Sequence, residues 1–338
     1  MTTRREFLAG AGAGSASAAL AAGQADASFV REALELPPQA VGMLIDATLC
    51  IGCQACVSAC RSANGVEVDD TPYAYAGWNE AHTWDTAADL DGETLNVIKV
   101  WRKGTAEVKD AEEDGFGFLK RHCLHCVDPS CVSVCPVSAM RKDAHSGIVT
   151  YDKDACIGCR YCSYGCPFGV PQFDLARPFG QINKCQMCIH LQREGKIPAC
   201  CDVCPTGASL FGPVSLLQAE AERRLAAEPG STMQFPRGDI VAQRPKHEAK
   251  VAHYQQRVYG ETEVGGTQVR YLSAVPFTQM GLPETGDFAP ARLSEGIQHT
   301  LYKWLAAPVL AILGAALVVR RNRNAQTHDT ARDAGGEA

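Results

Sequence analysis

The feature that most constrains this chain of 338 residues is the placement of its 17 cysteines, all of which lie between Cys50 and Cys204. Sixteen of them fall into four groups of four, each opening with two cysteines separated by two residues. The groups are Cys50, Cys53, Cys56 and Cys60; Cys123, Cys126, Cys131 and Cys135; Cys156, Cys159, Cys162 and Cys166; and Cys185, Cys188, Cys200 and Cys204. The strings LCIGCQACVSAC and ACIGCRYCSYGC form an internal repeat. A chain of this length buries enough apolar surface to fold without disulfides, so the cysteines require another explanation.

The first and third groups both have the spacing C-x2-C-x2-C-x3-C. This is the spacing of bacterial ferredoxins, in which three close thiolates bind one [4Fe-4S] cube and the fourth cysteine binds the other cluster of a pair. The second group widens the central gap to four residues, and the fourth group widens it to eleven. A proline follows the last cysteine in three groups, and Arg61 takes its place in the first. The pattern predicts iron–sulfur cluster ligands, because each iron requires one soft thiolate.

Disulfides and zinc are the two alternative uses of such cysteines. Disulfides are common in exported proteins, but four repeated C-x2-C openings fit cluster ligation better than a set of crosslinks. Zinc sites also use C-x2-C pairs, but they have no use for a third cysteine two residues later. The adjacent pair Cys200 and Cys201 leaves a further choice open. The three-residue gap of the other groups favours Cys200 with Cys204 and leaves Cys201 spare, whereas Cys201 with Cys204 would form a C-x-x-C pair.

Two histidines, His122 and His125, flank cysteines of the second group. They are either solvated neighbours of the cysteines or hydrogen-bonding partners that tune a cluster through its sulfur atoms. Tyr161, Tyr164 and Phe168 are expected to pack around the cofactor as core residues. The formal net charge of −6 argues against nucleic-acid binding, and no glycine-rich phosphate loop precedes a helix.

The first 27 residues have the features of a signal peptide. Arg4 and Arg5 are followed by Phe7 and Leu8, then by a weakly apolar stretch and the small residues of 25–27. Paired arginines in this context indicate the twin-arginine export route, with a surface helix as the alternative. That route carries folded proteins, so cofactors can be inserted before export.

Residues 304–319 near the other end form an uncharged apolar run. Its length is at the lower limit for crossing a hydrocarbon core about 30 Å thick. Tyr302 and Trp304 stand at one edge, and the arginines 320, 321 and 323 stand at the other. Positive charge stays on the cytoplasmic side, which places the body outside and the C-terminus inside. A buried core helix is the alternative, because Pro308 and Gly314 weaken a helix.

The predicted fold class is α+β, with two tandem pseudo-symmetric ferredoxin-like modules, an irregular extension and one C-terminal transmembrane helix. The predicted parts are a signal peptide (1–27), a linker (28–42), a four-cluster domain (43–213, with an insertion at 61–122), an extension (214–300), a transmembrane helix (301–320) and a polar tail (321–338). Strands are expected at Val97–Trp101, Ser209–Phe211 and Thr267–Leu272, and a helix is expected at Ser215–Ala227, with Leu216, Leu217, Ala221 and Leu225 on one face.

The four groups, with eleven residues inside the fourth, resemble the iron–sulfur beta subunits of membrane-bound respiratory oxidoreductases such as formate dehydrogenase, nitrate reductase and dimethyl sulfoxide reductase. The strings HCVDPSCVSVCPVSAM, YGETEVGGTQV and IQHTLYK, together with the signal and the C-terminal helix, narrow the resemblance. They are most similar to the HybA-type periplasmic subunits of Hyb (hydrogenase-2 type) nickel–iron hydrogenases.

This resemblance implies four [4Fe-4S] clusters that are paired by crosswise ligation. The implied ligands are a first set (Cys50, Cys53, Cys56, Cys204), a second set (Cys60, Cys185, Cys188, Cys200), a third set (Cys123, Cys126, Cys131, Cys166) and a fourth set (Cys135, Cys156, Cys159, Cys162). It also implies a chain with no catalytic site of its own.

The implied function is electron transfer at the periplasmic face of the inner membrane. Electrons would pass from the large and small subunits of a nickel–iron hydrogenase, where hydrogen is oxidised, to an integral membrane subunit that reduces quinone. Cluster spacing does not identify the electron donor, so a formate dehydrogenase is the alternative. A structural membrane anchor that uses its clusters only to fold is the alternative of another class.

Overall fold

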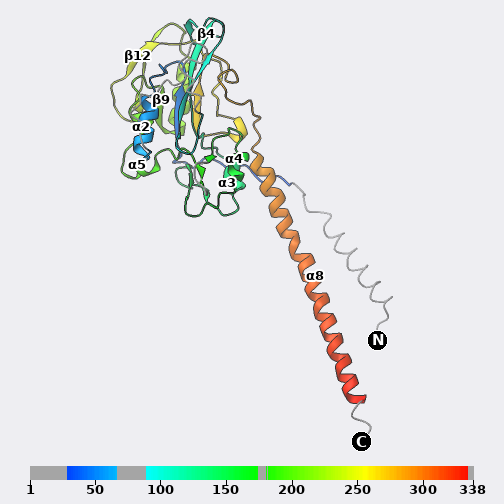
Figure 1. Cartoon of the computed structure of the whole chain (residues 1–338). Helices are drawn as coiled ribbons and strands as arrows, with labels where there is room; N and C mark the ends of the chain where they lie inside the picture. The colour runs from blue at the N-terminus through cyan, green and yellow to red at the C-terminus, as the bar shows by residue number, and fades with distance from the viewer. Residues whose placement is uncertain (1–28, 67–88, 174–179, 181, 334–338) are drawn as a thin grey trace. The chain divides into compact units, whose positions relative to one another are not determined.

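The computed structural model describes residues 29–66, 89–173, 180 and 182–333 (Figure 1). The chain divides into two compact units, one of which is Glu32–Arg292. The described parts of the other are 29–31 and 293–333. The signal peptide predicted at 1–27 lies outside the described residues.

A four-stranded sheet forms the centre of Glu32–Arg292. Its order is β11 (Gly238–Asp239), β9 (Ser209–Pro213), β1 (Val41–Asp46) and β13 (Val269–Leu272). Strand β1 runs antiparallel to β9 and parallel to β13. The strands expected near 209–211 and 267–272 are confirmed, the second beginning at Val269. Because β13 pairs with β1, part of the extension expected to be irregular belongs to the central sheet.

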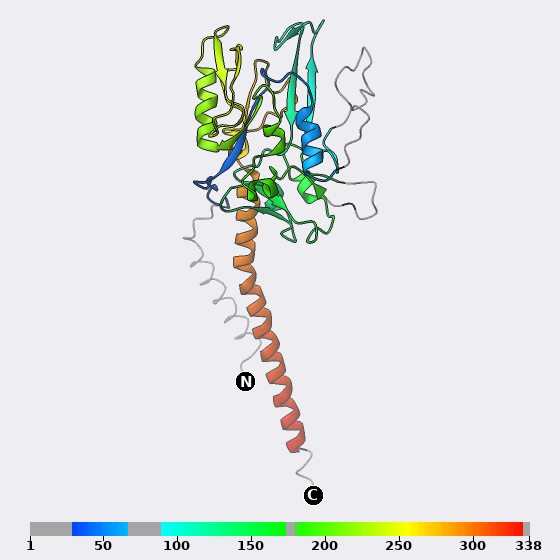
Figure 2. The same cartoon turned by 90° about the vertical axis from the view of Figure 1, so that its left-hand side faces the viewer.

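Helix α7 (Val214–Leu225) follows β9 and packs against β1. Figure 2 shows α7, in yellow-green, on one side of β1 and helix α2 (Ala55–Ala63), in blue, on the other. Val214, Leu217 and Ala221 are buried at helical spacing, which gives α7 one apolar face. The predicted helix is therefore confirmed. Leu216 was expected on its buried face, but its side chain is 45% exposed and lies outside that face.

Arg224 joins α7 to the end of β1. Its buried guanidinium forms ion pairs with Asp46 and Glu220, each at 2.8 Å, and lies over the ring of Phe235. The hydroxyl of Tyr254 donates a 2.8 Å hydrogen bond to the same Asp46 oxygen that pairs with Arg224. Since Asp46 closely precedes Cys50 in the chain, these contacts fix the start of the first cysteine group.

The predicted insertion contains a second sheet. Strands β2 (Val97–Arg102), β4 (Gly115–Arg121) and β3 (Val108–Lys109) lie in the order β2-β4-β3. The strand expected at Val97–Trp101 is confirmed, but β4 was not predicted, since glycines within a run argue against a strand. Both glycines have a packing reason. An added Cβ at Gly115 would lie 1.8 Å from the carbonyl oxygen of Ala111, and one at Gly117 would lie 3.2 Å from Met280.

The remaining elements of this unit are short. The helices are α3 (Ser130–Ser133), α4 (Tyr161–Tyr164), α5 (Ile189–Arg193), α6 (Ala199–Asp202) and the 3-10 turn η2 (Glu263–Gly265). The hairpins pair β5 (Met140–Lys142) with β6 (Val149–Tyr151), β7 (Gln172–Phe173) with β8 (Ile182–Asn183), and β10 (Thr232–Phe235) with β12 (His247–Lys250). The structure is thus a mixture of helix and sheet.

Helix α8 spans Pro290–Asp333 and is continuous through Pro308 and Gly314. Its segment Pro290–Arg321 is long and apolar enough to cross a membrane, with a mean hydropathy of 1.8 over 18 of its residues. Leu310, Ile312 and Leu317 are all about two-thirds exposed. The helix is longer than the predicted 301–320 and carries the apolar run in its middle.

The buried ion pair predicts a stability difference between two adjacent arginines. We expect Arg224→Leu to lower the free energy of unfolding by about 3–5 kcal/mol, because it leaves the carboxylate of Asp46 buried without its cation. Arg223 pairs with the same Glu220 but is 46% exposed, so Arg223→Leu should cost less than about 1 kcal/mol. Denaturant unfolding of the full chain measures both, and equal losses would contradict this account of Arg224.

Candidate metal centres

In each cysteine group, the residue just before the second cysteine has a positive φ. The four residues are Gly52, His125, Gly158 and Met187, with φ of 70°, 49°, 73° and 53°. Only glycine adopts this left-handed conformation without steric cost. At Gly52 a side chain would also collide with Phe118, since an added Cβ would lie 2.4 Å from its ring. All four groups thus turn sharply between their first two thiols.

The third cysteine of each group lies on a short helix. Cys56 is on α2, Cys131 on α3, Cys162 on α4 and Cys200 on α6. Helix α2 packs against α6, and α3 packs against α4, as Figure 1 shows for the second pair. The first group therefore meets the fourth, and the second group meets the third.

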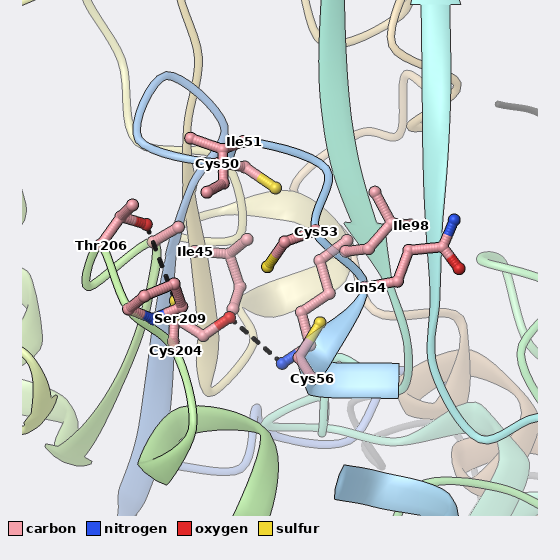
Figure 3. A pocket seen from close by; sticks show the side chains of 13 residues that line it. Ile45, Cys50, Ile51, Cys53, Gln54, Cys56, Ile98, Cys204, Thr206 and Ser209 are labelled. Atoms are coloured by element: carbon pink, nitrogen blue, oxygen red, sulfur yellow. Dashed lines mark hydrogen bonds between the residues drawn. The ribbon is translucent and has the colours of Figure 1, made fainter. Parts of the chain in front are cut away.

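The first set of thiols surrounds one pocket. Figure 3 shows Cys50, Cys53, Cys56 and Cys204 around one pocket, which Ile45 and Ile98 also line. Three of these cysteines come from the loop after β1 and the start of α2, and the fourth precedes β9. Residues about 150 positions apart in the chain therefore face one space, as the crosswise pairing requires.

The fourth set surrounds a second cavity. Cys135, Cys156, Cys159 and Cys162 line a space of about 370 Å³, together with Met140, Tyr151 and Ile182. Its two chain segments are the end of the second group and the beginning of the third. The structure thus brings this set together crosswise as well.

The second and third sets are identified by the thiols that act on one another. Burial, and then the nearby charges of Cys185, Cys200 and Cys188, raise the pKa of Cys60. Burial, and then Cys131, Cys166 and Cys123, raise the pKa of Cys126. The structure therefore brings the thiols of these two sets close together, and all 17 cysteines are free thiols. Which cysteines bind which cluster stays a prediction. Across the described residues, no three His, Cys, Asp or Glu side chains converge on a point where they would hold a single metal ion.

The chemistry of these thiols fits iron–sulfur clusters. Burial raises the pKa of Cys50 to about 11 and the pKa values of Cys56 and Cys185 to about 12. Metal is bound by thiolates, so thiols in such surroundings need a positively charged partner before they lose their protons. The irons of a cluster supply that charge, and four soft thiolates match the four irons of a [4Fe-4S] cube.

Cys200 and Cys201 are both buried but differ in their neighbours. A hydrogen bond with the Cys201 thiol, assisted by Lys120, lowers the pKa of Cys200 despite its burial. Cys200 acts on Cys60 and Cys185 of the second set. These effects favour Cys200 as the member of the second set, and the choice between Cys200 and Cys201 stays a prediction.

The four sets follow one another in a line. Cys56 of the first set lies near Cys200 of the second, because the charge of Cys200 acts on its thiol. In the same way, the charge of Cys123 in the third set acts on the thiol of Cys185 in the second. The charge of Cys162 in the fourth set acts on the thiol of Cys131 in the third. Cys53 and Cys159, which belong to the two end sets, are exposed, whereas most thiols of the middle sets are buried.

The two histidines are not solvated, which corrects one of the two readings of the sequence. His122 and His125 are 1% and 0% exposed. Nδ1 of His122 lies 2.8 Å from the carbonyl oxygen of Cys123, and Nδ1 of His125 accepts a hydrogen bond from the Val149 amide at 3.0 Å. Their Nε2 atoms are buried without a hydrogen-bond partner among the described residues.

The aromatic residues of the third group also differ from expectation. Phe168 is buried, but Tyr161 is 59% exposed and Tyr164 is 89% exposed. Both tyrosines lie on α4, a helix of only four residues that buries Cys162. One turn of helix has a single inner face, and the cysteine occupies it.

Two buried lysines were missed by the sequence reasoning. Lys120 on β4 and Lys184 just after β8 are each 2% exposed. The only signal in the sequence is a lysine within the apolar run FGFLK. Since the strand itself was not predicted, neither was the inward direction of Lys120.

Comparison with known proteins agrees with this geometry. A family model described as a 4Fe-4S dicluster domain matches residues 116–214. The hydrogenase-2 operon protein HybA of Escherichia coli O157:H7 is 44% identical over 300 residues, which cover 88% of this chain and 89% of that protein. The formate dehydrogenase-O iron-sulfur subunit of Escherichia coli K12 is 31% identical over 280 residues, which cover 82% and 79%. The similarity therefore extends well beyond the cysteine groups.

The adjacent cysteines provide a matched pair of variants. We expect Cys200→Ser to lower the iron content by about four per chain, or to alter the spectrum of one cluster, because it removes one of four thiolates. Cys201→Ser should leave the iron content unchanged. Iron analysis and electron paramagnetic resonance (EPR) of both purified variants distinguish them, and the opposite result would assign Cys201 as the ligand.

Proposed function

Because this chain belongs to the family of HybA-type iron–sulfur subunits, we propose that it carries electrons from a nickel–iron hydrogenase to a membrane subunit that reduces quinone. It is a [4Fe-4S] protein, as the dicluster domain and the grouped cysteines indicate. The observation that supports electron transfer most directly is the line of four thiol sets, each close to the next.

Each of the four sets would hold one [4Fe-4S] cluster, which gains and loses a single electron. Packing of α2 on α6 and of α3 on α4 supports two ferredoxin-like modules, each with two clusters. The thiolates hold the clusters, and the surrounding apolar side chains keep water away from the middle sets. Exposure of Cys53 and Cys159 supports the entry of electrons at one end and their exit at the other.

The chain would work at the periplasmic face of the inner membrane. The twin-arginine features of residues 1–27 support export after the clusters have been inserted. Helix α8 would anchor the chain, with its arginines at 320, 321 and 323 on the cytoplasmic side. The domain boundaries and the cytoplasmic tail predicted from the sequence belong to the same proposal.

A formate dehydrogenase is the second candidate donor, and the 31% identity to a formate dehydrogenase iron-sulfur subunit favours it. The 44% identity to HybA over most of both chains favours the hydrogenase. Both candidates use the same line of clusters, so they differ only in the enzyme at its entry.

The number of clusters is tested by iron analysis of the anaerobically purified chain. Four clusters require about sixteen iron atoms per chain. A value of about eight would limit the chain to two clusters. Bound zinc in place of iron would overturn the proposal.

Deletion of the chain distinguishes the two donors. We expect hydrogen-driven quinone reduction in membranes to fall to background, because the path to quinone is broken. Reduction of a soluble dye by the nickel–iron subunits should continue, since dyes accept electrons before this chain is reached. Formate-driven quinone reduction should be unchanged, and its loss in place of the hydrogen-driven activity would establish the alternative.

A further inference from the structure

The buried ammonium of Lys120 lies between two of the thiol sets. Lys120 extends from β4 and is 2% exposed. Its Nζ lies 3.2 Å from the hydroxyl oxygen of Ser209, and Lys120 lines the pocket of the first set. The charge of Lys120 also acts on the thiol of Cys200, which belongs to the second set. One cation thus lies close to thiols of both sets.

Burying an ammonium group costs several kcal/mol unless nearby anions compensate for its lost hydration. The charges that act on Lys120 come from the sulfur atoms of Cys200, Cys201 and Cys56. Lys120 in turn acts on Cys56 of the first set and on Cys60 and Cys188 of the second. Two of these three sulfurs, those of Cys200 and Cys56, belong to the proposed ligand sets and would carry negative charge as cluster ligands.

We propose that Lys120 is the shared counter-ion of the first and second clusters and raises both of their reduction potentials. This inference rests on the proposed function, because it requires clusters in both sets. Adding an electron to a cluster adds negative charge, and a fixed positive charge in a poorly hydrated interior stabilises that reduced state. Lys120 thus acts on the two clusters through its charge and does not bind hydrogen or quinone.

Lys184 provides a comparison within the same core. Its Nζ donates hydrogen bonds to the backbone carbonyl oxygens of Val149 and Cys185, the second at 2.9 Å. Its charge acts on Cys131 of the third set. Lys120 therefore belongs to the first half of the line, whereas Lys184 reaches the third set.

The test is a potentiometric titration of the purified complex followed by EPR. For Lys120→Met we expect the reduction equilibria of two clusters to shift toward the oxidised form by about tenfold or more, which corresponds to about 59 mV for a one-electron step. The signals of the other two clusters should keep their potentials. Lys120→Arg, which keeps the charge, should leave both potentials close to those of the unsubstituted protein.

Two further variants control for other effects. Lys103 is an exposed lysine that pairs with Glu113 on the surface, so Lys103→Met removes one charge without moving any potential. Lys120→Gln keeps a hydrogen-bond donor for Ser209 and removes only the charge. It gives the same test if Lys120→Met loses iron during purification.

Unchanged potentials in an iron-loaded Lys120→Gln or Lys120→Met protein would overturn this role of Lys120. So would equal shifts in all four clusters, because they would indicate a general change of the fold. The result is separable from the proposed function. A different electron donor would leave these potentials as expected, whereas a chain without iron would overturn the proposed function before Lys120 was tested.

Discussion

The rest of the structure depends on the burial of many cysteine thiols in one small core. Burial raises the pKa of a thiol, and neighbouring thiolates raise it further, as at Cys60 and Cys126. Thiolates in such a core are stable only with positive charge close to them. The chain supplies part of that charge through Lys120 and Lys184, and the cluster irons supply the rest. Cluster binding would therefore be coupled to the ionisation of these buried thiols.

The loops that carry the cysteines also depend on burial, because it holds some of their residues in a left-handed backbone conformation. Every group bends at a left-handed residue before its second cysteine, but only Gly52 and Gly158 do so without strain. His125 and Met187 adopt this conformation with a side chain, and both are buried. Their surroundings hold them there, because buried residues have little freedom to relax. Gln54 in the first group and Arg160 in the third are also left-handed, so every group contains a non-glycine residue in this conformation.

The sequence alone predicted the parts of this structure that follow from local spacing. The cysteine groups, the strand near Val97, the helix after Ser209 and the apolar run of α8 all have short-range patterns. Features that depend on distant contacts were missed. Strand β4 contains glycines whose reason is the proximity of Ala111 and Met280. Burial of His122 and exposure of Tyr164 likewise depend on which face of a short segment meets the core, and spacing carries no information on this.

The central sheet has a consequence for the order in which the protein matures. Strand β1 is made early but has β9 and β13 as its partners, and the first thiol set includes Cys204. A ribosome-bound chain that ends before residue 204 therefore has neither the sheet partner of β1 nor a full set of thiols for the first pocket. Contacts across such sequence separations form late and slowly. Until then the first three cysteines lack their fourth partner, and the reducing cytoplasm keeps them from forming disulfides.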